Sequence, residues 1–271
     1  PTASSAFGAS GPSHVARFID TGRLGLVTHD WVEMTLTGNT FTKTVHDFGY
    51  AMEIGSTSTA VISGNAISGY DTPAATDHSQ SGGVYIENAF TWAVTTAVAK
   101  PVQVLNNDIS ACQWGIYIGN EFDGYAGDVD LQVTLAGNTV QNAAIAPAPF
   151  PGDPYGGIYI TDEDRSAGSS VTVTGGGNTV RDNGQTGIIV AGWGDADIAV
   201  DLAGETVTGH QRGIHAMDSG GASAFNLSVT NSDFSGNALF GVENAIPGVT
   251  FDAQCDWWGT PTGPAHPGNP G

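Results

Sequence analysis

Apolar and polar residues alternate in short runs along most of the chain, and each run is bounded by Gly or Asn. Two typical runs are Gly115-Ile116-Tyr117-Ile118 and Gly157-Ile158-Tyr159-Ile160. A period of two over four to eight residues is typical of β-strands, whereas an amphipathic helix has a period near 3.6. The pattern therefore predicts an all-β protein built from many short strands.

One repeated signal marks a turn. It consists of Gly or Asn, then usually Asn, a small or polar residue and an apolar residue. Gly and Asn tolerate a positive φ better than other residues, so we expect a left-handed residue at the first position of each copy. The seven copies begin at Gly38, Gly64, Asn106, Gly137, Gly177, Gly204 and Asn231.

A second signal is Gly followed by apolar residues at alternate positions, and it alternates strictly with the first. Its copies begin at Gly49, Gly83, Gly115, Gly157, Gly187, Gly213 and Gly241. Successive copies lie 26 to 42 residues apart, and the shortest spacings fit a coil of three short strands and three turns. Repeats of this length that cannot bury their own apolar face stack into a solenoid. The sequence therefore predicts one parallel β-helix of about seven to eight coils.

The longer coils require loops outside the repeat. We expect these insertions at Tyr70–Ser81, Glu121–Asp128 and Ala143–Tyr155. The last of them contains four prolines, which are excluded from the interior of a sheet.

Stacked coils place equivalent residues above one another. The Asn of the first signal should therefore form a ladder, in which stacked side chains hydrogen-bond along the rod. We assign these Asn a structural role rather than a catalytic one. They are Asn39, Asn65, Asn107, Asn138 and Asn178.

The two ends of a solenoid need caps, because an open coil exposes strand edges. We expect an N-terminal cap region over 1–30, which contains a short amphipathic segment over 12–24. The parallel β-helix should occupy 31–258, with Trp257 and Trp258 plugging the last coil. Residues 259–271 are rich in Pro and Gly and are predicted to be a tail or a linker to a further module.

These repeats resemble right-handed parallel β-helix domains of the pectate-lyase-like superfamily, from about residue 31 to 251. The closing Cys255-Asp256-Trp257-Trp258-Gly259 and Gly263-Pro264 are similar to an Asn-Trp-Trp-Gly…Gly-Pro ending found in secreted and surface β-helix proteins, with Asp256 in place of Asn. The resemblance implies a secreted or cell-surface protein. It leaves the function open, because this fold carries lyases, hydrolases, epimerases, adhesins and structural modules.

The charge balance is strongly acidic, with 7 Lys and Arg against 27 Asp and Glu and a net charge of −20. Such a surface repels phosphate backbones, so we expect no nucleic-acid partner.

No run of 18 apolar residues exists, so we expect no transmembrane segment. The repeat places Cys112 and Cys255 several coils apart, which predicts two free thiols because a disulfide needs Cα atoms within about 7 Å.

Lyase or epimerase chemistry on a uronan would need a base and a cation-like partner for the substrate carboxylate. Arg165 and Arg212 each follow a repeat strand and lie near acidic residues or His, so they are candidate bases. His210 and His215 are candidate partners of Arg212. The paired-Asp and Gly-His-Gly motifs of polygalacturonase-like hydrolases are incomplete, and no Gly-x-Ser-x-Gly, His-Glu-x-x-His or nucleotide-binding motif is present.

Acidic residues follow several of the repeat strands and would lie along one edge of the rod. Carboxylate, amide and carbonyl oxygens are the ligands that Ca²⁺ prefers. The densest group is Asp162, Glu163 and Asp164, with Glu121 one coil earlier. We therefore retain Ca²⁺ as a candidate cofactor, with a solvated acidic edge as the alternative.

Aromatic residues near turns are candidates for stacking on sugar rings. They are Trp114, Trp193 and Tyr155, with packing on their own loops as the alternative.

Two functional hypotheses follow from the sequence. The first is an extracellular or cell-surface module with a structural, adhesive or glycan-binding role, whose partner is a polysaccharide or cell-envelope component. End-to-end or multi-domain assembly is compatible with it. The second is a polysaccharide lyase or uronan epimerase.

Overall fold

The computed structural model describes residues 16–21, 24–28, 32–45, 48–55, 57–71, 81–88, 98–120, 129–142, 156–163, 169–218, 220 and 223–263. The regular structure in these ranges is β-strand. The described residues contain no helix of the length and hydropathy needed to cross a membrane.

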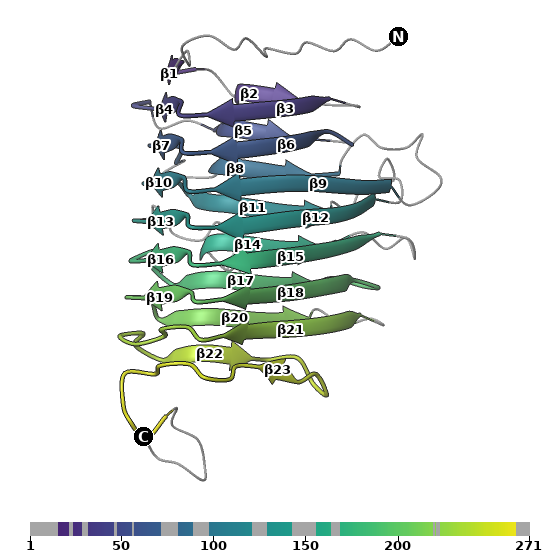
Figure 1. Ribbon diagram of the computed structural model, residues 1–271, viewed down its shortest axis with the longest axis vertical. Helices are drawn as coiled ribbons and strands as arrows, with labels where there is room; N and C mark the ends of the chain where they lie inside the picture. The colour runs from purple at the N-terminus through teal and green to yellow at the C-terminus, as the bar shows by residue number, and fades with distance from the viewer. Residues whose placement is uncertain are drawn as a thin grey trace.

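The strands form three parallel sheets, A, B and C, and the chain visits them in this order in each coil except the last, where no sheet A strand lies between β21 and β22 (Figure 1). Sheet A contains β1 (Arg17–Ile19), β4 (Thr40–Thr42), β7 (Ala66–Ser68), β10 (Asp108–Ser110), β13 (Thr139–Gln141), β16 (Thr179–Arg181) and β19 (Thr206–Thr208). Sheet B contains β2 (Leu24–Thr28), β5 (Tyr50–Ile54), β8 (Gly82–Glu87), β11 (Trp114–Asn120), β14 (Gly156–Asp162), β17 (Thr186–Gly192), β20 (Arg212–Asp218) and β22 (Phe240–Asn244). Sheet C contains β3 (Glu33–Thr37), β6 (Thr59–Ser63), β9 (Val98–Leu105), β12 (Val129–Ala136), β15 (Ser170–Gly176), β18 (Asp197–Ala203), β21 (Ala224–Thr230) and β23 (Phe251–Asp252).

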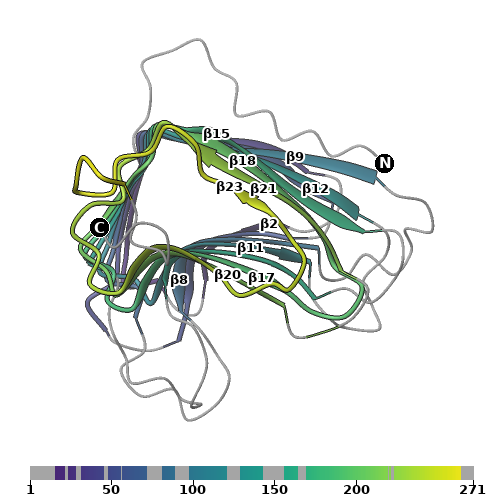
Figure 2. The same cartoon turned by 90° about the horizontal axis from the view of Figure 1, so that it is seen from below.

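The predicted parallel β-helix is confirmed. Sheets B and C each contain 8 strands in the described part of the chain, in agreement with the predicted seven to eight coils. Seen along the axis, sheets B and C face each other, and the short strands of sheet A close one side (Figure 2).

Apolar residues at alternate positions of the strands fill the interior of the solenoid. In β12, Leu131, Val133 and Leu135 are buried, while Gln132 between them is exposed. The parallel register places Val133 beside Val173 of the next coil, so like residues stack along the rod. Burial of this stack is the main driving force for folding, because no coil can bury its own apolar face.

The predicted left-handed turn residues are confirmed at every copy of the first signal. They lie at the turn from sheet C to sheet A, with φ between 53° and 71°. The seven residues are Gly38, Gly64, Asn106, Gly137, Gly177, Gly204 and Asn231.

The predicted Asn ladder is also confirmed at this turn. The backbone N–H of Asn107 donates to Oδ1 of Asn138 at 3.0 Å, and that of Asn138 donates to Oδ1 of Asn178 at 3.0 Å. The side-chain amides of Asn65, Asn107, Asn138 and Asn178 also donate to a carbonyl in the sheet C strand of the preceding coil, as when Nδ2 of Asn138 donates to the carbonyl of Val104 at 2.7 Å. The side chains thus satisfy backbone groups that would otherwise be buried without a partner.

The ladder continues beyond the asparagines with other residue types. Nδ2 of Asn178 donates to Oε1 of Glu205 at 3.0 Å. The N–H of Glu205 donates to Oγ of Ser232, and the N–H of Ser232 donates to Oδ1 of Asp256. Glu205 is 1% exposed, and burial raises its pKa to about 7.

The Gly of the second signal has a packing role that the sequence pattern did not reveal. A Cβ on Gly115 would lie 2.6 Å from the carbonyl oxygen of Gly157 and 2.2 Å from a methyl group of Val140. Gly83, Gly187 and Gly213 show the same close approach to the next coil. Gly is required at these positions because a Cβ would collide with the backbone of the next coil.

A lysine occupies one interior position of sheet C, where the neighbouring coil has Leu131. Nζ of Lys100 donates to the carbonyl of Ile54 at 2.7 Å and to that of Glu87 at 2.5 Å. Burial lowers the pKa of Lys100 to about 7, against the opposing effect of the Glu87 carboxylate. Lys100 thus satisfies carbonyl groups at the corner where the chain leaves sheet B.

The two ends differ in their packing. β1 and β2 lie within the range predicted for the N-terminal cap and pair with β4 and β5, so the sheets begin before residue 31. At the other end Trp258 packs on the core, with its ring 5.2 Å from that of Phe234. Its neighbour Trp257 is 47% exposed, so only one of the two Trp plugs the last coil.

Both cysteines are free, as predicted: Cys112 is buried and Cys255 is exposed. Burial raises the pKa of the Cys112 thiol to about 12. Most of the three predicted insertions lies outside the described residues, as do residues 1–15 and 264–271.

Candidate functional site

The outer face of sheet B carries a stack of aromatic rings. Tyr50 stacks on Tyr85 with ring centres 4.4 Å apart, Tyr85 stacks on Tyr117 at 4.2 Å, and Tyr117 lies 5.4 Å from Tyr159. The register that aligns Tyr85, Tyr117 and Tyr159 causes this stack. Tyr85, Tyr117 and Tyr159 belong to a second apolar cluster outside the main core, which Ile189 and Ala191 extend toward the C-terminal coils.

Trp114 belongs to this cluster. Its ring lies 4.8 Å from that of Tyr159, and the residue is 1% exposed. A buried ring presents no free face to a sugar, so the predicted ligand-binding role of Trp114 does not agree with its position. Its role in the structure is packing.

A charged group follows the aromatic stack on the same face. Nε of Arg212 donates to Oε2 of Glu243, and Nε2 of His215 lies 3.8 Å from the same oxygen. The side chains of Arg212, His215 and Glu243 are 28%, 19% and 27% exposed. Burial lowers the pKa of His215, and the Glu243 carboxylate opposes this shift. His215 is therefore mainly neutral at pH 7, and one of its ring nitrogens can accept a proton.

Exposed aromatic residues flank this group. Phe240 is 46% exposed and pairs in register with Arg212. Trp193 is 40% exposed and directly follows β17, at the next alternate position after the outward-facing Ile189 and Ala191. We call Trp193, Arg212, His215, Phe240 and Glu243 the sheet B patch. Its extent along the seven-residue strand β20 is about 20 Å at 3.3 Å per residue.

Among the predicted catalytic residues, His210 does not belong to the patch. It is buried at the turn from sheet A to sheet B, where its N–H donates to Oδ1 of Asn237 at 3.0 Å. Its Nε2 lies 3.5 Å from Nδ2 of Asn183. Burial lowers the pKa of His210, and the hydrogen bond to Asn237 opposes this. His210 thus links two coils, and its candidacy as a catalytic residue is not supported by this position.

The predicted metal-binding corner is only partly described. Asp162 is fully buried, and its Oδ2 accepts a hydrogen bond of 2.9 Å from the N–H of Asp197. The N–H of Glu163 donates to the carbonyl of Asn120 at 2.8 Å. In the described ranges, no three His, Cys, Asp or Glu side chains come together as metal ligands would. Glu121 and Asp164 lie outside those ranges, so a Ca²⁺ site at this corner stays a prediction.

Tyr155 and Arg165 also lie outside the described residues. By contrast, Glu243 was missed in the sequence, although a signal was present. Gly241-Val242-Glu243 aligns with Gly213-Ile214-His215 in the second repeat signal, so the register between these two copies would have placed Glu243 beside His215.

No curated protein sequence matches the chain. One solved structure with similarity is a crystal structure of the periplasmic alginate epimerase AlgG. It shares 10% sequence identity with a TM-score of 0.28, over 86% of this chain and 78% of that chain. Similarity at this level carries no conclusion about function.

The family model described as "Right handed beta helix region" matches residues 17–234. This range covers most of the chain and includes the strands from β1 to β21. The stacked parallel sheets, the ladder and the family match agree, and the chain belongs to the right-handed β-helix family.

Proposed function

We propose that this protein is an extracellular or cell-surface β-helix module that binds glycan through the sheet B patch. The observation that supports this most is the partly exposed group of Arg212, His215 and Glu243 on the outer face of sheet B, with the exposed ring of Trp193 near the far end of the same face. Glycan sites commonly combine an aromatic platform, which stacks on the apolar face of a sugar ring, with a few polar groups that fix its hydroxyls.

The chemistry of the patch suits hydroxyl or carboxylate groups. The guanidinium of Arg212 has five N–H donors, and the bond to Glu243 uses the one on Nε. Glu243 holds the guanidinium in place and adds a carboxylate acceptor. His215 supplies a neutral ring that can donate from one nitrogen and accept at the other.

The wider role is part of the same proposal. A rigid rod with a polar surface suits a structural or adhesive position at the cell surface or in a secreted assembly, with a polysaccharide or cell-envelope component as partner. Joining to further modules or rods is compatible with this role. Ca²⁺ binding near Asp162 and Glu163 would add rigidity at one corner.

We expect Trp193→Ala to weaken glycan binding about five- to thirtyfold, because it removes the stacking surface, which contributes roughly 1–2 kcal/mol. Affinity gel electrophoresis with soluble neutral and uronate polysaccharides measures the effect. The matched control is Trp257→Ala, which removes another exposed Trp outside the patch. Equal loss in both variants, or no loss in Trp193→Ala, would contradict the proposed site.

A second candidate function is a polysaccharide lyase or uronan epimerase, favoured by the contact of Arg212 and His215 with one carboxylate. In that reaction a neutral base removes the proton beside the uronate carboxylate, and a cationic group stabilises the charge that develops. His215 would be the base and Arg212 the cationic group.

The two candidates are separated by product analysis. For a binding module we expect no unsaturated product from alginate or polygalacturonate by ultraviolet absorbance, and no change in uronate composition by NMR. Either signal, if abolished by His215→Ala and retained in Trp257→Ala, would replace the binding proposal with the enzymatic one.

A further inference from the structure

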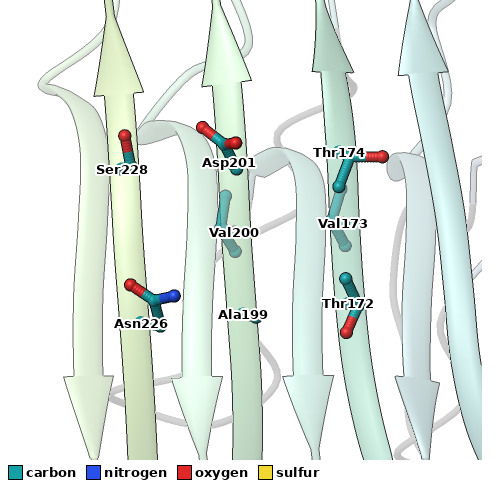
Figure 3. Close-up of a pocket in the computed structure, with 8 residues that line it drawn as sticks. All are labelled: Thr172, Val173, Thr174, Ala199, Val200, Asp201, Asn226 and Ser228. Atoms are coloured by element: carbon teal, nitrogen blue, oxygen red, sulfur yellow. The ribbon is translucent and has the colours of Figure 1, made fainter.

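The outer face of sheet C carries a shallow depression of about 200 Å³ across β15, β18 and β21 (Figure 3). Five polar side chains and one small residue face outward around it. The small residue, Ala199, lies between Thr172 and Asn226, and its short side chain leaves the hollow. The polar residues are Thr172, Thr174, Asp201, Asn226 and Ser228.

The register arranges these residues in two rows across the strands. One row is Thr172, Ala199 and Asn226, and the other is Thr174, Asp201 and Ser228 (Figure 3). Neighbouring strands lie about 4.8 Å apart, and the rows about 6.6 Å apart along the strand. The backbone ladders of both neighbouring coils hold these positions, so little ordering is needed when a ligand binds.

The polar side chains around the depression do not contribute hydrogen bonds to the described part of the fold. In the part of the chain that the structure describes, none of these five side chains makes a hydrogen bond or ion pair with another protein group. Three hydroxyls, one amide and one carboxylate therefore point into solvent with their hydrogen-bonding capacity unused.

Charge and polarity select the class of ligand. Asp201 is the one charged residue of the lining and the chain has a net charge of −20, so a polyanion is disfavoured. Val173 and Val200 point inward and are 0% and 2% exposed. The face therefore lacks the apolar centre that a protein interface needs. Neutral sugar hydroxyls match the exposed donors and acceptors.

The spacing of the coils fits an extended sugar chain. The strand separation of about 4.8 Å is close to the length of one pyranose ring along a 1,4-linked chain. We propose that the sheet C depression binds an uncharged polysaccharide strand that crosses β15, β18 and β21, with one sugar ring per coil. This surface lies on a different sheet from the sheet B patch and does not depend on it.

The test fills the depression with a long side chain. Ala199→Arg places a guanidinium over the hollow, and Ala203→Arg is the matched control because Ala203 lies exposed on the same strand and face outside the depression. Both are made in the Trp193→Ala background, so that any binding at the sheet B patch is already weakened. Affinity gel electrophoresis uses hydroxyethyl cellulose, galactomannan and polygalacturonate.

We expect at least one of the neutral polymers to retard the background protein, and Ala199→Arg to reduce its affinity at least tenfold. Ala203→Arg should change it less than twofold. Asp201→Ala, which removes acceptors without blocking the hollow, should reduce it about fivefold. Far-UV circular dichroism and melting temperature establish that each variant is folded.

Three results would overturn the proposal. They are no retardation by either neutral polymer, equal binding by Ala199→Arg and the background protein, and binding of polygalacturonate alone through this face. The sheet B proposal is judged separately, from the effect of Trp193→Ala against Trp257→Ala.

Discussion

Replacing Asn138 by Leu is expected to destabilise the protein by about 4 kcal/mol, because it breaks the ladder at its centre. Oδ1 of Asn138 accepts hydrogen bonds from the backbone N–H and from Nδ2 of Asn107, and its own Nδ2 donates to the carbonyl of Val104. Leu has a similar volume but no polar atom, so these buried groups lose their partners. Each buried polar group left without a partner costs about 1–3 kcal/mol.

Urea titration followed by circular dichroism measures this loss. The matched control is Asn226→Leu, which makes the same substitution at an exposed position of β21 and should change the free energy of unfolding by less than about 0.5 kcal/mol. If the two variants had equal stability, the ladder would not be the stabilising element that its hydrogen bonds indicate.

Glu205→Gln is expected to stabilise the protein at pH 8 and to have little effect at pH 4.5. Burial raises the pKa of Glu205 from 4.5 to about 7, against its hydrogen bonds from Asn178. The folded state therefore binds a proton that the unfolded state releases between pH 4.5 and 7, and stability falls as the pH rises through this window. Above pH 7 Glu205 is ionised in both states, and the burial of its carboxylate lowers the free energy of unfolding by about 3 kcal/mol.

Oε2 of Glu205 is buried without a hydrogen-bond partner in the described structure, so the ionised carboxylate is poorly solvated there. Gln keeps the acceptor for Asn178 and cannot ionise. We expect the difference in unfolding free energy between the two proteins to grow from near zero at pH 4.5 to about 3 kcal/mol at pH 8. Other groups titrate equally in the wild type and in Glu205→Gln, so their contributions cancel in the difference between the two unfolding free energies.

Glu33→Gln is the control, since Glu33 is exposed on β3, and should change stability by less than about 0.5 kcal/mol at either pH. A constant difference between wild type and Glu205→Gln from pH 4.5 to 8 would show that Glu205 does not titrate in this window.

The sequence predicted the turns well because each is encoded locally. Gly and Asn adopt a positive φ at lower cost than most residues, so every copy of the first signal marked a left-handed residue, whereas the positive φ of Ala111 and Cys255 had no such signal. Asn138 could be assigned to a ladder in advance because identical residues at repeating positions of a solenoid must stack. Glu205 was recognised as a member of the repeat, but its burial depends on the coils on either side.

The candidate site was harder to predict because it depends on contacts between coils. His210 and Arg212 are two residues apart, yet one lies inside the turn and the other on the outer face of sheet B. Trp114 lies at the start of a strand, and only the stacked rings of neighbouring coils show that it is buried. Glu243 lies 31 residues from Arg212, and the parallel register brings them into contact.

The sequence by itself thus determined the solenoid, its turns and its ladder, because a short repeat with period-two strands has one way to bury its apolar face. Only the tertiary structure decided which polar residues of each coil face inward, which face outward, and which of them meet. Those properties depend on the register between coils and on the neighbours above and below each residue, and no single repeat contains that information.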